Sequence, residues 1–173
     1  SSPAVGDVNL DGVPEVFIAA SYSMTEGSVY GFTLVPRLDT VTSPANNDYP
    51  VYHAASLPGF PVPVPGPIYS SVALGDVNGD DTLEIAVSGD DRSLHLWDWR
   101  GNTLSGFPQP LDMETRSTAA LADIDPPHPG REILVLSGDS RLFAFRGDGQ
   151  PVPGFPARKA WAGVANSSVA GGD

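Results

Sequence analysis

The sequence predicts an all-β protein made of repeated four-stranded units, and three observations support this fold class. Short motifs recur along the chain, apolar runs of strand length recur beside them, and no long stretch shows the apolar periodicity of a helix. Each unit spans about 48 residues, which is the size of one β-propeller blade. We therefore expect β-propeller blades of about four antiparallel strands, with three blades followed by the start of a fourth.

Two motifs mark the repeat. The first is a lead of small residues that closes on an aspartate, in SSPAVGD (1–7), SSVALGD (70–76), STAALAD (117–123) and SSVAGGD (167–173). The second is Gly-Phe-Pro, at 59–61, 106–108 and 154–156. Their common phase divides the chain into a first blade at 1–64, a second at 65–112, a third at 113–160 and the first strand of a further blade at 161–173.

Each unit carries two strand patterns that a short turn joins into a hairpin. A β-branched apolar run comes first, at 15–19, 84–88 and 132–136, and an alternating run follows it, at 28–34, 93–99 and 141–147. The first unit is longer than the others. We place its extra residues in a polar, Pro- and Asn-rich surface loop at 36–55.

Composition narrows the possible partners. The chain has 21 Asp and Glu against 9 Lys and Arg, a net charge of -12 and no cysteine. Nucleic acids and anionic membranes both attract clusters of basic residues, so neither is an expected partner. The lack of cysteine excludes disulfides and thiolate metal sites, and no apolar run approaches the length of a membrane span. An acidic chain of this kind suits a protein that binds cations.

Between the lead and the first strand of a unit lies an acidic loop. DVNLDGVPE (7–15, the first loop) and DVNGDDTLE (76–84, the second loop) both carry oxygen side chains at positions 1, 3 and 5 and a glutamate at position 9. Ca²⁺ takes six to eight such hard oxygen ligands. The predicted metal ligands are Asp7, Asn9, Asp11, the carbonyl of Val13 and Glu15, and then Asp76, Asn78, Asp80, the carbonyl of Thr82 and Glu84. The alternative is a plain turn held by local hydrogen bonds.

The third loop, 123–132, departs from this pattern. It keeps Asp123, Asp125 and Glu132, but Pro127 stands at position 5 and the loop is one residue longer. Two interpretations stay open: a third metal site, or a degenerate loop that its prolines make rigid. His128 is expected to be exposed, since imidazole is a poor ligand for calcium.

The acidic loops, the recurring lead and the Gly-Phe-Pro marker together resemble the FG-GAP/VCBS repeats, which are the blades of integrin-alpha-type propellers and of many secreted microbial proteins. The resemblance covers nearly the whole chain outside 36–55. It implies a D-x-[DN]-x-D-G-x-x-[DE] loop that binds calcium within a blade, and it assigns the family's ligands to Asp7, Asn9, Asp11 and Glu15 and to Asp76, Asn78, Asp80 and Glu84. Asp81, where the family favours glycine, and Pro127 depart from it.

The predicted function is a calcium-binding extracellular module, secreted or at the cell surface, that binds a protein or glycan ligand in adhesion. Calcium is structural, and specificity lies in surface loops. The alternatives are the propeller part of a secreted polysaccharide-acting enzyme and a structural subunit of a surface layer or filament. The low count of Lys and Arg and the lack of a nucleophile or metalloprotease motif disfavour an enzyme. Because three blades do not close a ring, we expect either a longer chain or self-assembly.

Three smaller features of the sequence do not require a catalytic or adhesive role. His95 alternates with leucines in a strand, which predicts packing rather than catalysis. Arg146-Gly147-Asp148 spells an adhesive tripeptide, but it falls where a strand passes into a turn of every unit. Trp99 has no aromatic counterpart in the third unit, so it is the better tryptophan for a surface contact.

Overall fold

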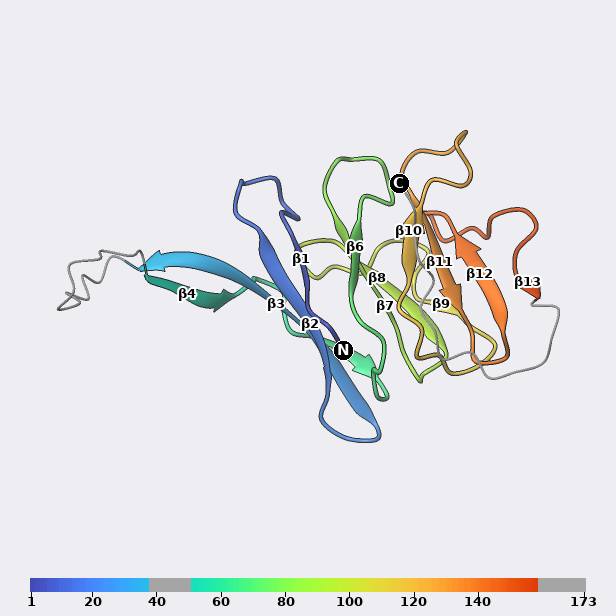
Figure 1. The fold of residues 1–173 in the computed structure, drawn as a ribbon, viewed down its shortest axis with the longest axis horizontal. Helices are drawn as coiled ribbons and strands as arrows, with labels where there is room; N and C mark the ends of the chain where they lie inside the picture. Colours follow the sequence, from blue (N-terminus) through green and yellow to red (C-terminus); the bar gives the residue numbers. More distant parts are fainter. Residues whose placement is uncertain (38–50, 159–173) are drawn as a thin grey trace.

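The structure is a computed structural model that describes residues 1–37 and 51–158. Within those residues the chain forms strands and turns and no helix. The strands make three antiparallel sheets, one with five strands and two with four. Each sheet is built from consecutive strands of the chain, and the three sheets stand side by side along the long axis of the molecule (Figure 1). The predicted all-β class is confirmed.

The strands of the first sheet are β1 (Ala4–Gly6), β2 (Glu15–Ser21), β3 (Glu26–Arg37), β4 (Val51–Ser56) and β5 (Val62–Pro65). The second sheet contains β6 (Ala73–Gly75), β7 (Glu84–Ser88), β8 (Ser93–Trp97) and β9 (Gln109–Pro110). The third contains β10 (Ala120–Ala122), β11 (Glu132–Leu136), β12 (Arg141–Phe145) and β13 (Ala157–Arg158). Each follows the same order, with the strand after the acidic loop paired to the lead on one side and to the alternating strand on the other.

The expected hairpins are present. β7 and β11 begin and end where the apolar runs predict, at 84–88 and 132–136, and β2 continues two residues past its apolar run. β8 and β12 end two residues before the predicted ends, because Asp98 and Arg146 already belong to turns. The Asp98 N–H donates to the carbonyl of Asn102, and the Arg146 N–H donates to that of Gln150.

The expectation of a surface loop at 36–55 is wrong at both of its ends. β3 runs on to Arg37 and β4 begins at Val51, and the two pair antiparallel from Phe32–Ser56 to Arg37–Val51. Hydrogen bonding along this ladder prevails over the polar composition of the segment. Residues 38–50 of the predicted loop, and the predicted start of a further blade at 161–173, lie outside the described residues.

The core lies between the sheets. Alternate residues of a strand face opposite ways, so each sheet has two faces. We name as face A the side that carries Val16 and Ile18 of the first sheet, Ile85 and Val87 of the second and Ile133 and Val135 of the third, and as face B the opposite side. Face A of the second sheet packs on face B of the first, and face A of the third packs on face B of the second. One interface is therefore used twice.

The Gly-Phe-Pro marker belongs to this interface. All three copies contain a cis Phe–Pro peptide bond and a glycine with positive φ. A Cβ on Gly59 would lie 1.8 Å from the carbonyl oxygen of Arg100, and a Cβ on Gly106 would lie 2.2 Å from that of Asp148. Arg100 and Asp148 stand in the turn of the following sheet. A Cβ on Gly154 would meet no atom of the described residues within 4 Å.

Candidate functional site

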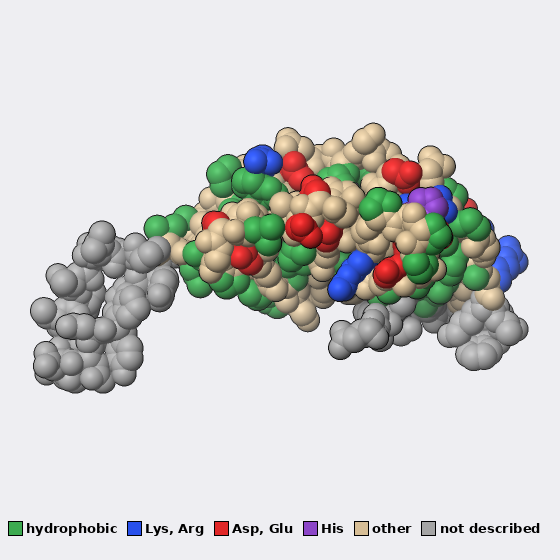
Figure 2. Space-filling view, turned by 90° about the horizontal axis from the view of Figure 1, so that it is seen from above, with side chains coloured by type: hydrophobic (Ala, Val, Ile, Leu, Met, Phe, Trp, Pro, Cys, Tyr) green, Lys and Arg blue, Asp and Glu red, His purple; other side chains and the backbone are tan. Residues whose placement is uncertain are grey.

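The three acidic loops lie together at one end of the sheets, which is the upper end in Figure 1. Backbone hydrogen bonds join neighbouring loops: the Leu83 N–H donates to the carbonyl of Val8 over 3.1 Å, and the Arg131 N–H donates to that of Asp76 over 2.9 Å. Acidic side chains are spread over this end of the molecule (Figure 2). The sequence-predicted candidates are therefore neighbours in space.

In the first loop, the oxygen side chains at positions 1, 3 and 5 wrap around the backbone of the same turn. Asp7 accepts from the N–H groups of Asp11 at 3.1 Å and Gly12 at 2.9 Å. Asn9 accepts from the N–H of Asp11 at 3.0 Å, and Asp11 accepts from that of Val13 at 2.8 Å. These bonds are those of a local turn, and each acceptor oxygen keeps a further lone pair.

The second loop repeats the arrangement. Asp76 accepts from the N–H groups of Gly79, Asp80 and Asp81 at 2.7–3.2 Å. Asp80 accepts from both the N–H and the hydroxyl of Thr82, at 2.9 and 2.6 Å. The hydroxyl bond holds the pKa of Asp80 below its usual value. In both loops, the side chains at positions 1, 3 and 5 thus bind the backbone of their own turn.

Both loops also need two residues with positive φ. In the first loop these are Leu10 (φ 61°) and Gly12 (φ 85°), and in the second they are Gly79 (φ 78°) and Asp81 (φ 72°). Each loop therefore places one glycine and one non-glycine residue at positions 4 and 6, in opposite order. The left-handed backbone conformation at position 6 explains why a glycine is favoured there. Asp81 adopts the same conformation at a cost in conformational free energy, because its Cβ approaches the backbone.

The glutamate at the end of each loop binds the loop to its strand. Glu15, Glu84 and Glu132 are the first residues of β2, β7 and β11, and their exposed fractions are 0–1%. One carboxylate oxygen accepts a backbone N–H of the loop in each sheet: Glu15 from Val8 at 3.1 Å, Glu84 from Val77 at 2.9 Å, and Glu132 from Ile124 at 2.8 Å and Asp125 at 3.0 Å.

The other oxygen of Glu15 is less well satisfied. Oε1 of Glu15 is buried without a well-formed hydrogen bond, although a contact with the Thr33 side chain lowers the pKa of this glutamate. Burial, together with Asp11 and Asp7, outweighs this contact and raises the pKa of Glu15. A buried carboxylate that lacks a well-formed hydrogen bond on one oxygen and lies beside two further carboxylates is unfavourable unless a cation or a proton neutralises it.

Glu84 stands in an equally acidic setting. Its Oε1 accepts from the side-chain amide of Asn78 at 3.1 Å. Burial, followed by the charges of Asp80, Asp76 and Asp98, raises the pKa of Glu84 to about 7. The second loop therefore concentrates negative charge around a buried carboxylate in the same way as the first.

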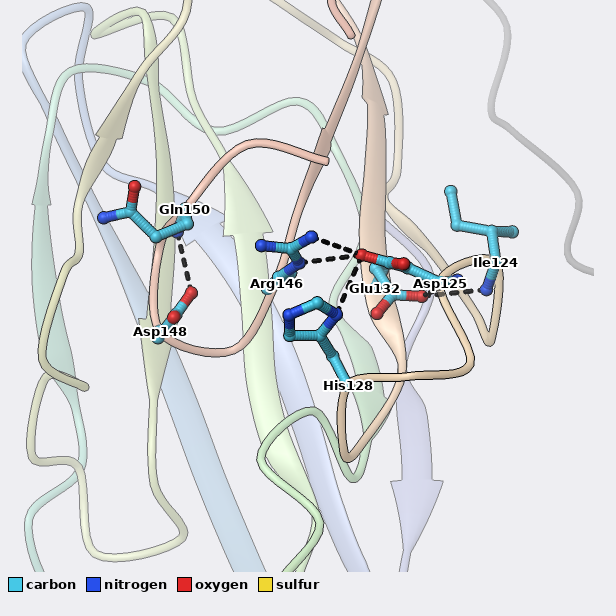
Figure 3. A network of polar contacts seen from close by, with 7 residues as sticks. All are labelled: Ile124, Asp125, His128, Glu132, Arg146, Asp148 and Gln150. Carbon is cyan, nitrogen blue, oxygen red and sulfur yellow. Dashed lines mark hydrogen bonds and ion pairs between the residues drawn. The ribbon is translucent and has the colours of Figure 1, made fainter. Parts of the chain in front are cut away.

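A cation from a neighbouring turn, Arg146, pairs with the third loop. The guanidinium of Arg146 donates to Oδ2 of Asp125 through Nε at 2.8 Å and Nη2 at 2.5 Å, and His128 Nδ1 lies 3.1 Å from the same oxygen (Figure 3). The side chains of Arg146 and Asp125 are 19% and 18% exposed. The carboxylate at position 3 of this loop is thus already neutralised. Arg146 is also not free to serve as part of an adhesive tripeptide.

Asp98 and Arg146 are two residues beside the acidic loops whose contacts there could not be read from the loop pattern. Each directly follows the alternating strand of its sheet, β8 or β12, so they occupy equivalent positions. Asp98 lines a cavity of about 500 Å³ with Asn78, Asp80 and Glu84, whereas Arg146 binds Asp125. Comparing the residues that follow the two strands would have revealed an acid in one unit and a base in the other.

Among residues 1–37 and 51–158, no group of three or more His, Cys, Asp or Glu side chains is arranged to hold a metal ion. Each predicted ligand set contains three carboxylates, and in neither loop do these three form such a group; the sets also include the amides of Asn9 and Asn78 and the backbone carbonyls of Val13 and Thr82. Asp7, Asp11 and Glu15 are close enough for the two aspartates to raise the pKa of the glutamate.

The structure shows the surroundings of His95 and Trp99. His95 is 8% exposed, pairs with Asp91 over 2.7 Å and stacks on Trp97 at 5.4 Å, so it packs within the second sheet. The Trp99 ring is partly buried, and the guanidinium carbon of Arg100 lies over it, 3.8 Å from the ring centroid.

Within the described residues, the structure has no helix that could span a membrane.

Comparison of the sequence with protein-family models gives no match, and comparison with curated proteins also gives none. The functional argument therefore rests on the residues of the chain itself.

Proposed function

We propose that the chain is a calcium-binding module in which the first and second loops each hold one Ca²⁺ as a structural ion. The observation that carries this proposal is the buried Oε1 of Glu15, which lacks a well-formed hydrogen bond and belongs to a carboxylate whose pKa is raised by burial, Asp11 and Asp7. The corresponding glutamate of the second loop, Glu84, is surrounded by three aspartates.

Calcium fits the chemistry of these loops. The donors are carboxylates, amide oxygens and backbone carbonyls, with no sulfur and no histidine among them, and this set suits a hard divalent cation. The ligands in the first loop are Asp7, Asn9, Asp11, the Val13 carbonyl and Glu15. Those in the second are Asp76, Asn78, Asp80, the Thr82 carbonyl and Glu84, with Asp98 as a further acid beside them.

The third loop is not part of this proposal. Asp123, Asp125 and Glu132 had been candidates for a further site. The guanidinium of Arg146 already neutralises Asp125, and Glu132 accepts two backbone N–H groups. We therefore infer two calcium ions per chain, with a protein cation in place of the third.

We further propose that the three sheets are blades of a β-propeller of the FG-GAP/VCBS kind. The repeated packing of face A on face B supports this, because propeller blades pack face to face around an axis. Sites of modest affinity suit the millimolar calcium outside cells, so we place the module in an extracellular or cell-surface setting, where it binds a protein or glycan ligand.

Isothermal titration of the calcium-free chain with Ca²⁺ tests the proposal, together with thermal unfolding in calcium and in chelator. We expect two sites and a melting temperature that falls on chelation. Asp11→Ala and Asp80→Ala should each remove one site, and Glu114→Gln, whose side chain is 57% exposed, should remove none. A titration without heat and a melting temperature unaffected by chelator would contradict the proposal. Three sites would contradict the role given to Arg146.

A further inference from the structure

One position of each sheet lies across from the buried glutamate. The cross-strand pairs next to it are Val16–Phe32, Ile85–Trp97 and Ile133–Phe145, and in each pair the first residue directly follows the glutamate. Because the strands are antiparallel, the residue after the second member of each pair lies across from the glutamate itself. We call this the facing position, and its residues are Thr33, Asp98 and Arg146.

The residues at the facing position differ in charge. Thr33 is neutral and contacts Glu15 through its side chain. Asp98 is acidic, and after burial and two aspartates of the loop it adds to the raised pKa of Glu84. Arg146 is basic and donates two hydrogen bonds to the aspartate at position 3 of the third loop. One place in the sheet therefore holds a neutral, an acidic and a basic residue in the three units.

The first and second loops offer the same side chains to an ion. Positions 1, 3, 5 and 9 are Asp, Asn, Asp and Glu in both loops. Outside these positions, the second loop has an exposed acid, Asp81, where the first has Gly12. Substitution at the facing position alone therefore isolates its effect better than a comparison of the two loops.

Asp98 lies close to the proposed ligands of the second loop. It lines the cavity of about 500 Å³ together with Asn78, Asp80 and Glu84. Its carboxylate is fixed by its own turn, where it accepts the N–H groups of residues 100 and 102 at 2.9 and 2.8 Å. Two like charges that face each other across a sheet are unfavourable, and a divalent cation beside them removes the repulsion. Asp98 therefore favours calcium in the second loop without having to bind it.

The third loop shows the effect of a base at the facing position. Oδ2 of Asp125 accepts from Nε and Nη2 of Arg146, and Nδ1 of His128 lies beside the same oxygen (Figure 3). An oxygen with these partners has little capacity left for a metal ion, and the fixed positive charge repels a divalent cation. Thr33, as a neutral residue, neither attracts nor repels an ion in the first loop.

We propose that the residue at the facing position sets the calcium affinity of its loop. An acid there raises the affinity, a neutral residue leaves it to the ligands of the loop, and a base excludes the ion. The second loop, beside Asp98, is then the tighter site, and the first loop, beside Thr33, is the weaker one. This inference rests on the proposed binding of calcium by these two loops.

Calcium titration of chains with one intact loop measures each affinity separately. Asp11→Ala leaves the second loop and Asp80→Ala leaves the first, and we expect the lower Kd for the second loop. In the Asp11→Ala chain, Asp98→Thr should weaken binding by about tenfold and Asp98→Arg should abolish it. In the Asp80→Ala chain, Thr33→Asp should tighten binding by about tenfold and Thr33→Arg should abolish it.

Glu114 provides the control for net charge. It is exposed and lies by the turn between β11 and β12, at the end of the sheets away from the acidic loops. Glu114→Thr and Glu114→Arg make the same changes of charge as the substitutions of Asp98, and each Kd should stay within about twofold because solvent and salt screen distant exposed charges.

A matched pair of substitutions separates the charge of Asp98 from its role in the turn. Asp98→Asn keeps an oxygen for the backbone N–H groups and loses the charge, so it should weaken the second site by about tenfold. Asp98→Glu keeps the charge on a longer side chain and should stay within about threefold of the parent. The pair gives the answer even where Asp98→Arg does not fold. A weaker site in the glutamate variant and an unchanged site in the asparagine variant would overturn the proposal.

The titration of the parent chain distinguishes the two proposals. A parent that binds no calcium would contradict the calcium-binding function, and this inference with it. A parent that binds two ions, with affinities that the substitutions of Thr33 and Asp98 leave unchanged, would overturn this inference alone.

Discussion

Arg146 donates two hydrogen bonds to a single carboxylate oxygen of Asp125, and both side chains are largely buried. In the neighbouring sheet the position of Arg146 is taken by Asp98, which adds negative charge to the second loop instead of removing it. One position after the alternating strand therefore distinguishes a loop whose aspartate pairs with a protein cation from a loop that has a further acid beside it.

Arg146→Met tests the importance of this pair for stability. It keeps most of the aliphatic stem but leaves Asp125 without its guanidinium, so we expect the free energy of unfolding in urea to fall by about 1–3 kcal/mol. Arg131→Met is the control, because Arg131 is exposed and only its backbone N–H makes a contact in the loops. An equal loss in both variants would show that the pair contributes nothing.

Without calcium, the stability of the chain should fall as the pH rises from 5 to 8. The pKa of Glu84 is about 7 in the folded state against 4.5 ordinarily, so between these values the folded chain binds more protons than the unfolded chain. Stability decreases with pH wherever the folded state binds more protons. Glu84 should contribute a fall of about 3 kcal/mol across this window.

Urea unfolding of the parent and of Glu84→Gln in chelator, at pH 5 and pH 8, isolates this contribution. The variant should lose most of the difference between the two pH values and should be the more stable protein at pH 8. Glu114→Gln removes an exposed carboxylate and should behave like the parent. A parent that is more stable at pH 8 than at pH 5 in chelator would contradict the raised pKa.

The second and third copies of the Gly-Phe-Pro marker allow the effect of packing between sheets to be separated from that of backbone strain. Gly106 and Gly154 have φ values of 88° and 92°, so alanine strains the backbone equally at both. Only at Gly106 does the added Cβ meet another sheet, 2.2 Å from the Asp148 carbonyl oxygen. Gly154→Ala should cost about 1–2 kcal/mol and Gly106→Ala about 1–3 kcal/mol more. Equal melting temperatures would contradict the close approach.

A matched pair in the first loop tests its backbone conformation. A Cβ on Gly12 would meet nothing within 4 Å, so Gly12→Ala measures the strain at positive φ alone and should cost about 1 kcal/mol. Leu10→Gly relieves the same strain at an exposed position and should stabilise the chain by about 0.5 kcal/mol. Changes of the same sign in the two variants would mean that the loop does not adopt this turn.

Much of the fold could be predicted from the sequence because the repeat is strong. The apolar runs at 84–88 and 132–136 coincide with β7 and β11, and the acidic loops lie between strands as their spacing predicts. The ends of β3 and β4 could not be predicted, since a polar, Pro-rich composition masked strands whose stability comes from pairing with each other. Local sequence does not carry that information.

The sequence predicted which residues of one loop lie together, but it did not predict which residues from other parts of the chain lie beside the loop. The 1-3-5-9 spacing locates Asp7, Asn9, Asp11 and Glu15, because one tight turn brings these residues together. Asp98 and Arg146 come from a turn 14 residues beyond Glu84 or Glu132, and only the sheet brings them beside the loops. Their opposite charges, and hence the different character of the third loop, depend on that tertiary contact.

The hydrogen bond from the Leu83 N–H to the carbonyl of Val8 joins the first loop to the second. The N–H of Val8 is bound by Glu15, and Leu83 directly precedes Glu84, so each end of the bond adjoins a buried glutamate. An ion that fixes one glutamate also fixes a residue that orients the other loop. Occupancy of the first loop should therefore raise the affinity of the second, and by reciprocity the reverse. In the proposed calcium-bound module, the first and second loops would then fill cooperatively, as one switch that responds more steeply to calcium concentration than a single site would.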